Sequence, residues 1–177
     1  IIVTYPQWPR GWQVAADWLR FSDEGGMTRE VISHFIFLSE RILGPLNLVW
    51  AFTDYPDEGN LCETQVAARL VNEVGLPVTI MGSVGGAQPE RQEVTIKGSK
   101  ISRRISEFAI DTVSSGGPFV PTDSIPDDTR ATSLKAQLDD LTLLMAGKPN
   151  RLATIDEALR VQILVEEILV YVWDELS

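Results

Sequence analysis

The chain has 177 residues, 44% of them hydrophobic and 23% charged, which is typical of a globular protein with a sizeable core rather than of a disordered segment. Its formal net charge of −10 argues against nucleic-acid binding, which needs clustered Lys and Arg, and no apolar run reaches the length of a membrane span. A single cysteine, Cys62, cannot form an internal disulfide, so we expect a cytoplasmic protein.

The first residues, Ile1 to Tyr5, are β-branched and aromatic and predict a strand that ends at Pro6. Because the chain starts without Met and enters this strand at once, we interpret residues 1–177 as a single α+β domain cut from the C-terminal part of a longer protein. The following stretch, residues 8–23, contains three tryptophans and receives no firm assignment.

A helix is predicted for residues 27–43, between the pair Gly25-Gly26 and the pair Gly44-Pro45. Apolar residues recur along it at helical spacing and predict the face that packs on the core. This stripe consists of Val31, Phe35, Leu38 and Ile42, widened by Ile32, Ile36 and Leu43.

From Leu46 the apolar period changes to two, and short turns separate the segments, which predicts antiparallel strands. These strands are expected at residues 46–53, 62–72, 76–83, 92–96, 101–105 and 107–113. A loop of about 15 residues, 114–128, follows and exceeds the usual connection length.

Two helices are predicted to close the chain, one over residues 129–146 and one that opens with the capping box from Thr154 to Glu157. The apolar face of the last helix consists of Ala158, Val161, Val165, Ile168 and Val172. The element order predicts an α+β fold: an open-faced, mostly antiparallel sheet with helices packed on one face.

Alternation along the strands predicts which side chains the helices cover: Leu48, Trp50, Val66, Leu70, Val78 and Ile80. The open face then carries Val49, Ala51, Ala67, Val71, Thr79 and Met81, mixed with Glu63, Gln65 and Arg69. This mixture favours a homo-oligomer interface through the open sheet face, but a solvated face with scattered apolar residues is an equal alternative.

Glu30 and His34, the only histidine, are four residues apart on the first predicted helix, so their side chains share one side of it. A carboxylate beside an imidazole suits proton transfer near neutral pH. Pairs with this spacing are also common as plain helix-stabilising contacts. Two details favour chemistry: the pair flanks the core stripe, and Gly25-Gly26 allows a close approach to the helix N-terminus.

Other residues point to packing or solvation. Cys62 is expected to be a buried apolar residue, and the carboxylates of Asp54, Asp57 and Glu58 are expected to be solvated in a turn. We expect no metal site, because one histidine, one cysteine and scattered acids make no ligand set. The run Gly82–Gly86 does not lead into a helix, which excludes a Rossmann phosphate site within this chain.

Three segments in order resemble the C-terminal domain of the Gfo/Idh/MocA oxidoreductases. Gly25-Gly26 through Glu30, His34 and Leu43-Gly44-Pro45 resembles the family's Gly-Gly, acid-x-x-x-His, Leu-Gly helix. The hairpin around Lys97–Lys100 and the segment Leu152–Gln162 resemble the family's later motifs. The acid is Glu rather than the usual Asp, and Phe37 stands where the family often has Asp.

The resemblance implies a fold like the C-terminal domain of glyceraldehyde-3-phosphate dehydrogenase and an intact parent with an N-terminal Rossmann domain that binds NAD or NADP. It implies His34 as proton donor or acceptor and Glu30 as the group that orients it or binds a substrate hydroxyl. The substrate would be a sugar, inositol or similar polyol. This chain alone would hold no cofactor and be inactive. The alternative is a non-catalytic α+β dimerisation or ligand-binding module.

Overall fold

The structure is a computed structural model that describes residues 1–57, 59–122 and 128–171. The chain divides into two compact units, Ile1–Val94 with Leu159–Ser177, and Thr95–Ala158. Each unit is described by itself. Glu58, Val172 and part of the predicted 114–128 loop lie outside the described residues, and the prediction of a single domain over residues 1–177 stays a prediction.

The first unit contains a sheet whose strand order is β2-β3-β4-β1-β5. The strands are β1 (Ile2–Tyr5), β2 (Leu46–Asp54), β3 (Gln65–Asn72), β4 (Pro77–Val84) and β5 (Arg91–Lys97), of which β5 continues into the second unit. β1 pairs with β4 in parallel and with β5 antiparallel, and the hairpins β2–β3 and β3–β4 are antiparallel. The first strand therefore enters the middle of the sheet.

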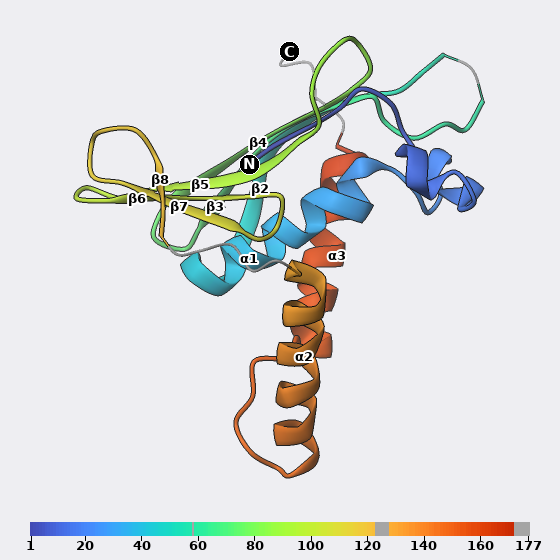
Figure 1. Ribbon diagram of the computed structural model, residues 1–177. Helices are drawn as coiled ribbons and strands as arrows, with labels where there is room; N and C mark the ends of the chain where they lie inside the picture. Colours follow the sequence, from blue (N-terminus) through green and yellow to red (C-terminus); the bar gives the residue numbers. More distant parts are fainter. Residues whose placement is uncertain (58, 123–127, 172–177) are drawn as a thin grey trace. The chain divides into compact units, whose positions relative to one another are not determined.

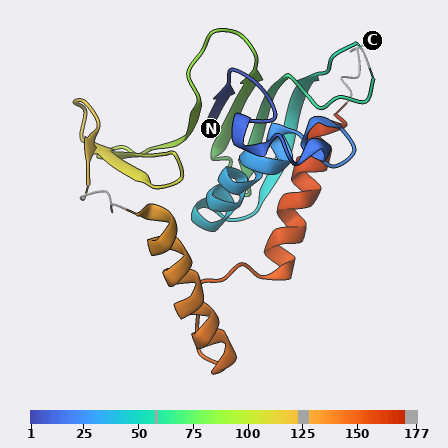
Figure 2. The same ribbon diagram turned by 45° about the vertical axis from the view of Figure 1, so that its right-hand side comes forward.

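Helices lie on one side of this sheet, as Figures 1 and 2 show. They are the single π-helical turn η3 (Thr28–Ile32), the helix α1 (Ser33–Leu43) and the last helix α3 (Ile155–Leu169). The sheet makes room for η3 at Gly82, where an added Cβ would come within 3.1 Å of the Met27 and Ile32 side chains. Removal of apolar side chains from water at this contact is the main force that holds the layers together.

Cross-strand register shows which side chains face the helices. Ala51, Ala68 and Ile80 form one row and are each 0% exposed. The predicted burial of Val66, Leu70, Val78 and Ile80 is confirmed. The opposite face carries the row Phe52, Ala67, Met81 and Ile2, in which Phe52 and Met81 are 50% and 52% exposed.

Two residues of β2 lie on the sides opposite to those expected, because the register shifts between Leu48 and Trp50. The extra residue there, Val49, forms a bulge that reverses the alternation. Trp50 pairs with Arg69 and lies on the open face, whereas Ala51 is buried under the helices. Glu63 was also expected on the open face, but it precedes β3 and is 1% exposed.

The predicted helix of residues 27–43 forms, but its buried face is displaced. Val31, Ile32, Phe35 and Ile36 are buried as expected, whereas Ile42 is 48% exposed. In the second half of α1, Ser39 and Glu40 face inward instead, four residues after the buried Phe35 and Ile36. Burial of Glu40 is tolerated because its carboxylate accepts from the Leu46 amide and pairs with Arg160 of α3.

The unassigned stretch after β1 forms two short 3-10 helices, η1 (Gly11–Gln13) and η2 (Asp17–Arg20). In the last helix, burial of the predicted residues Val161, Val165 and Ile168 is confirmed, whereas Ala158, predicted on the same face, is exposed. The predicted capping box is confirmed as well, since Glu157 accepts from the Thr154 amide and donates its own amide to the Thr154 hydroxyl.

The second unit contains β6 (Ser102–Ser106), β7 (Ile110–Ser114), β8 (Val120–Pro121) and the helix α2 (Thr129–Met145). The predicted strand of residues 107–113 starts later, because Glu107 and Phe108 have φ values of 51° and 61° and form a left-handed turn. The short strand β8 pairs with β7 inside the segment expected to be a loop.

The predicted class is confirmed: the fold is α+β, with a mostly antiparallel sheet and helices on one face. Within the ranges that the structure describes, no helix has the length and apolarity to cross a membrane.

Candidate functional site

Other parts of the chain occupy the space beside the two glycines before η3. This space is therefore not open to a ligand, contrary to what the sequence suggested. A Cβ on Gly25 would lie 2.4 Å from the carbonyl oxygen of Leu19, and one on Gly26 would lie 2.2 Å from Oε2 of Glu63. Both distances are far below van der Waals contact. The pair therefore serves close internal packing at the N-terminus of the helix.

Glu30 lies in η3, and two residues from the N-terminal segment hold its carboxylate. Gln13 Nε2 donates to Oε1 of Glu30 over 3.1 Å, and a guanidinium nitrogen of Arg10 lies 3.9 Å from the same oxygen. Arg10 also donates to Oε1 of Gln13 over 2.8 Å. Arg10, Gln13 and Glu30 thus form a connected polar cluster, called here the Glu30 cluster.

Aromatic rings fix Arg10 in that cluster. Its guanidinium carbon lies 4.6 Å from the ring centre of Trp12 and 5.3 Å from that of Tyr5. Contacts of this kind attract a cation to the ring face. Burial raises the pKa of Tyr5 to about 12 despite the nearby Arg10 charge, so the phenol stays neutral at physiological pH. The cation therefore has one defined position against Glu30.

His34 lies one turn further on, as the second residue of α1, and its side chain is exposed. The helix thus presents Glu30 and His34 from successive turns, one in η3 and the other in α1. The carboxylate of Glu30 is directed to Gln13 and Arg10. Their joint role in catalysis stays a prediction.

A cavity of about 310 Å³ opens beside Glu30, between the N-terminal segment and the last helix. Its lining consists of Trp18, Asp23, Glu24, Arg29, Glu30, Gln162 and Glu166. Figure 2 shows the N-terminal 3-10 segment beside α3, in agreement with this lining. Of the two residues proposed from sequence, Glu30 is part of the wall and His34 is not among the described residues that line it.

Arg29 is the cation in this wall, and each of its three guanidinium nitrogens donates a hydrogen bond to another group of the chain. Nε and one terminal nitrogen bind the two oxygens of Glu166 over 2.8 and 2.7 Å. The other terminal nitrogen donates to the carbonyls of Ser22 and Gly25. The hydrogen bond from Arg29 lowers the pKa of Glu166. The remaining wall offers mainly carboxylates and the half-exposed ring of Trp18, which suit hydroxyl groups and the apolar face of a sugar ring.

Sequence patterns alone do not mark Arg10, Gln13, Arg29, Glu63 or Glu166 as residues of a functional site. A weak signal existed for Arg29, which precedes Glu30 and lies in the same Gly-Gly helix. The others come from segments that the sequence could not place beside that helix, since their contacts span 17 to 137 residues along the chain.

Cys62 is 7% exposed, as expected, and burial raises its pKa to about 12, which keeps the thiol protonated. Within residues 1–57, 59–122 and 128–171, no group of three or more His, Cys, Asp and Glu side chains is placed to hold a metal ion. Gly85 and Gly86 follow β4 with positive φ, and the chain continues to β5 without a helix. The described residues around this run do not fit a dinucleotide phosphate site.

Comparison with solved structures gives the architecture a context, although no protein-family profile and no curated protein sequence matches the chain. The 3-ketoreductase KijD10 from Actinomadura kijaniata, solved with NADP and TDP-benzene, matches with a TM-score of 0.68 and 18% identity. That match covers 94% of this chain and 51% of KijD10. The chain therefore shares its fold with part of this 3-ketoreductase.

Two further solved structures agree with that assignment of the fold. The WlbA dehydrogenase from Bordetella pertussis, solved with NADH and UDP-GlcNAcA, has a TM-score of 0.65 at 19% identity over 94% of this chain and 52% of its own. GnnA, a UDP-N-acetylglucosamine 3-dehydrogenase from Acidithiobacillus ferrooxidans, matches with a TM-score of 0.68 and 14% identity. That match covers 96% of this chain and 50% of GnnA. The chain thus spans about half the length of KijD10, WlbA and GnnA.

Proposed function

We propose that this chain is the substrate-binding and oligomerisation domain of an NAD(P)-dependent oxidoreductase that acts on a sugar, inositol or similar polyol. The observation that carries the proposal is Glu30, which lies in the wall of a cavity while Gln13 and Arg10 hold its carboxylate in place. A fixed carboxylate at a cavity wall can accept a hydrogen bond from a substrate hydroxyl. The shared fold with dehydrogenases and ketoreductases supports the same class.

In this proposal, His34 transfers the proton at the reacting hydroxyl or carbonyl of the substrate. An imidazole suits this step because it changes protonation state near neutral pH. Its exposed position one turn after Glu30 leaves it accessible to a molecule that contacts both residues. Glu30 orients the imidazole or binds a neighbouring hydroxyl.

The cofactor, NAD or NADP, is assigned to a Rossmann domain of the parent protein. The described residues around Gly82–Gly86 do not fit a dinucleotide phosphate site, and in this proposal they take no part in holding the cofactor. KijD10 and WlbA, which share the fold, were solved with NADP and NADH respectively.

The chemistry is tested in the parent protein by replacing His34 with Ala. Turnover should fall about 10²–10⁴-fold, the usual contribution of one general acid or base, while the affinity for NAD or NADP, measured by nicotinamide fluorescence, stays the same. Arg41→Gln is the matched control, since Arg41 is an exposed residue two turns further along the same helix. Unchanged turnover in H34A would remove His34 from the reaction.

The oligomerisation role rests on the open face of the first unit. Its cross-strand row of Phe52, Ala67, Met81 and Ile2 exposes two large apolar side chains by about half. Large exposed apolar rows on a sheet favour association with a second copy, although a solvated face is the alternative.

A non-catalytic dimerisation or ligand-binding module remains the second candidate. The observation in its favour is the Glu30 cluster itself, because a carboxylate held by an arginine and a glutamine also serves a purely structural role. This candidate predicts that Glu30→Gln lowers the free energy of unfolding without changing the turnover of the parent protein.

A further inference from the structure

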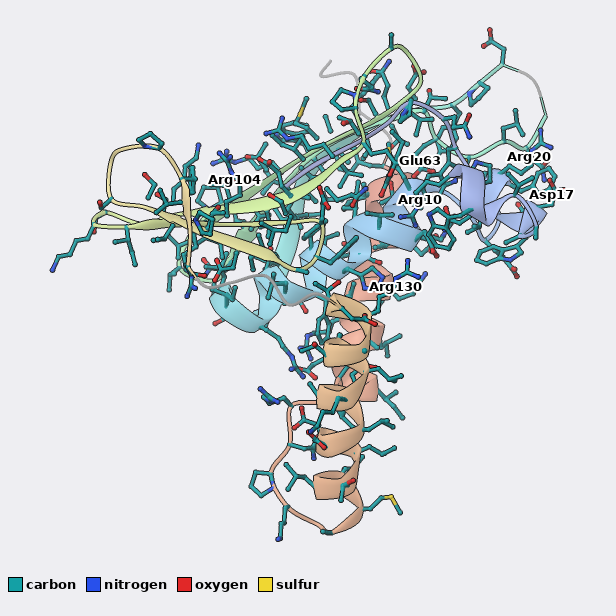
Figure 3. All side chains as sticks on the ribbon, viewed as in Figure 1. Arg10, Asp17, Arg20, Glu63, Arg104 and Arg130 are labelled. Atoms are coloured by element: carbon teal, nitrogen blue, oxygen red, sulfur yellow. The ribbon has the colours of Figure 1, made fainter. Side chains whose placement is uncertain are left out.

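Glu63 is a buried carboxyl group at the N-terminus of the helix that carries Glu30 and His34. It is 1% exposed, and its Oε1 accepts from the backbone amide of Thr28 over 2.7 Å. Figure 3 shows Glu63 next to the start of this helix, although 35 residues separate it from Thr28. An amide at the start of a helix lacks a partner within the helix, so this bond supplies one.

The second oxygen of Glu63 is fixed by close packing. Oε2 lies only 2.2 Å from the position that a Cβ of Gly26 would take. Gly26 also has a φ of 101°, which residues with an L side chain rarely adopt. Within the described residues, Oε2 of Glu63 and the hydroxyl of Thr28 lack a hydrogen-bond partner. The carboxyl group therefore contacts the helix through one short bond and one backbone contact that only glycine permits.

The backbone of Glu63 is itself tied to its surroundings on both sides. The amide of Cys62 donates to the Arg20 carbonyl over 2.8 Å, and the amide of Thr64 donates to the Asp54 carbonyl over 2.8 Å. The strand β3 begins two residues after Glu63, at Gln65. Glu63 thus connects the helix start to the sheet.

The amide of Thr28, which Glu63 holds, lies close along the helix to the two proposed site residues. Glu30 lies two residues after Thr28, in the same π-turn, and His34 lies six residues after it. A shift of the Thr28 amide therefore moves both side chains, because the helix backbone between them is hydrogen-bonded and stiff.

The same helix has a comparable anchor at its other end. Asn72, 8% exposed, donates from Nδ2 to the carbonyl of Leu43 over 2.7 Å. Its Oδ1 accepts from the amides of Val74 and Leu76. Asn72 is thus a buried polar side chain that holds the end of the helix distant from Glu30, which makes it a matched control.

We propose that Glu63 is a positioning residue: it sets the place of Glu30 and His34 by holding the amide of Thr28 against Gly26. The inference rests on the proposed function for the meaning of those two side chains. Its structural content, that Glu63 determines the surroundings of His34, is testable without a substrate.

The test uses NMR of the natural full-length protein, with the His34 ring signal assigned by its loss in His34→Gln. In Glu63→Ala, we expect this signal to shift and the amides from Thr28 to His34 to exchange with solvent about tenfold faster, because the first turn of the helix loses its hydrogen bond to the sheet side. Glu63→Gln keeps an acceptor oxygen and should restore the wild-type signal and exchange rates.

Asn72→Ala should leave the His34 signal and the exchange at residues 28–34 unchanged, while it accelerates exchange near Leu76. An equal response of His34 to both alanine variants would mean general loosening and would overturn the proposal, as would an unchanged His34 signal in E63A. If E63A does not fold, Glu63→Asp, which withdraws the carboxylate by one methylene, should give the same local changes.

The two proposals fail separately in this design. A shifted His34 signal in E63A together with unchanged turnover in His34→Ala would support the positioning role and contradict the proposed chemistry. An unshifted signal with a large loss of turnover in H34A would do the reverse.

Discussion

At the scale of single residues, Gly26 is constrained both by its backbone and by its neighbour. Its φ is 101°, and a Cβ would lie 2.2 Å from Oε2 of Glu63. Gly44, with a φ of 82° and nothing within 4 Å of its Cβ position, is constrained by the backbone alone.

Replacing each glycine with alanine separates these two constraints. Gly44→Ala should lower the free energy of unfolding by about 1–2 kcal/mol through backbone strain, and Gly26→Ala should lower it by roughly 2 kcal/mol more, because a buried carboxyl group must move. Urea unfolding measures both. An equal decrease in the free energy of unfolding of both variants would show that the Glu63 side chain moves away from residue 26 without a loss of stability.

The pH dependence of stability reports on Glu63 as well. Burial raises its pKa above the ordinary value of 4.5, although the hydrogen bond from the Thr28 amide and the charge of Arg29 oppose this. The folded state therefore binds the proton more tightly than the unfolded state, and stability falls as the pH rises from 4.5 through the raised pKa.

Glu63→Gln removes this titration, so the free energy of unfolding of the variant relative to wild type should increase with pH over that range. Urea unfolding between pH 4.5 and pH 8 measures the difference. Glu166→Gln is the contrasting variant, because Arg29 lowers the pKa of Glu166 and its contribution is lost as the pH falls below 4.5. A difference between E63Q and wild type that stays constant with pH would contradict the expected shift.

Sequence reasoning identified Glu30 and His34 from local spacing, and the structure places them on successive turns of one helix. It could not identify Arg10 and Gln13 as the partners of Glu30. A helix pattern contains information about residues three or four apart, whereas these partners come from a 3-10 segment with no periodic signal.

At the scale of elements, the bulge at Val49 decides which side of β2 faces the helices. Alternation of apolar residues continues from Leu48 to Trp50, so the pattern alone assigns Trp50 to the covered side and Ala51 to the open face. One inserted residue reverses every later side chain, and the bulge is visible only in the pairing with β3. Strand existence followed from composition, but strand orientation did not.

The contact between η3 and α3 depends on the paired hydrogen bonds from Arg29 to Glu166, whose side chains are 17% and 40% exposed. Arg29→Ala should lower the free energy of unfolding by about 1–2 kcal/mol, a value reduced for the solvent exposure of Glu166. Chemical unfolding of Arg29→Ala, Glu166→Gln and the double variant should show a coupling energy of about 1 kcal/mol.

Lys135→Ala is the matched control for this ion pair. Lys135 and Asp139 are exposed by 76% and 63% and lie one turn apart on α2. Loss of such a pair should cost at most about 0.5 kcal/mol. An equal cost in Arg29→Ala would mean that the bond between η3 and α3 contributes no more than a surface pair.

At the scale of the whole molecule, the open sheet face predicts the state of association. Met81→Glu places a charge in the middle strand of the row of Phe52, Ala67 and Ile2. In a symmetric interface the change occurs twice, so we expect dissociation to become at least about tenfold easier. Light scattering over a concentration series measures this.

Leu76→Glu is the corresponding control, since Leu76 is 49% exposed but lies in the turn before β4, outside that row. It should leave the association unchanged. A protein that stays monomeric at all concentrations, or an equal effect of both variants, would assign the open face to solvent.

The sequence by itself determined the α+β class, the helix with Glu30 and His34, the burial of Val31, Phe35, Val161 and Val165, and the capping box at Thr154. Those features depend on contacts within one turn or one strand, and local periodicity encodes them. The tertiary structure alone decided that β1 enters between β4 and β5, that Glu63 fills the space at Gly26, and that Glu30 joins Arg10 and Gln13 beside a cavity. Each of these joins segments far apart in the chain, and complementary shape and charge in the folded state select them.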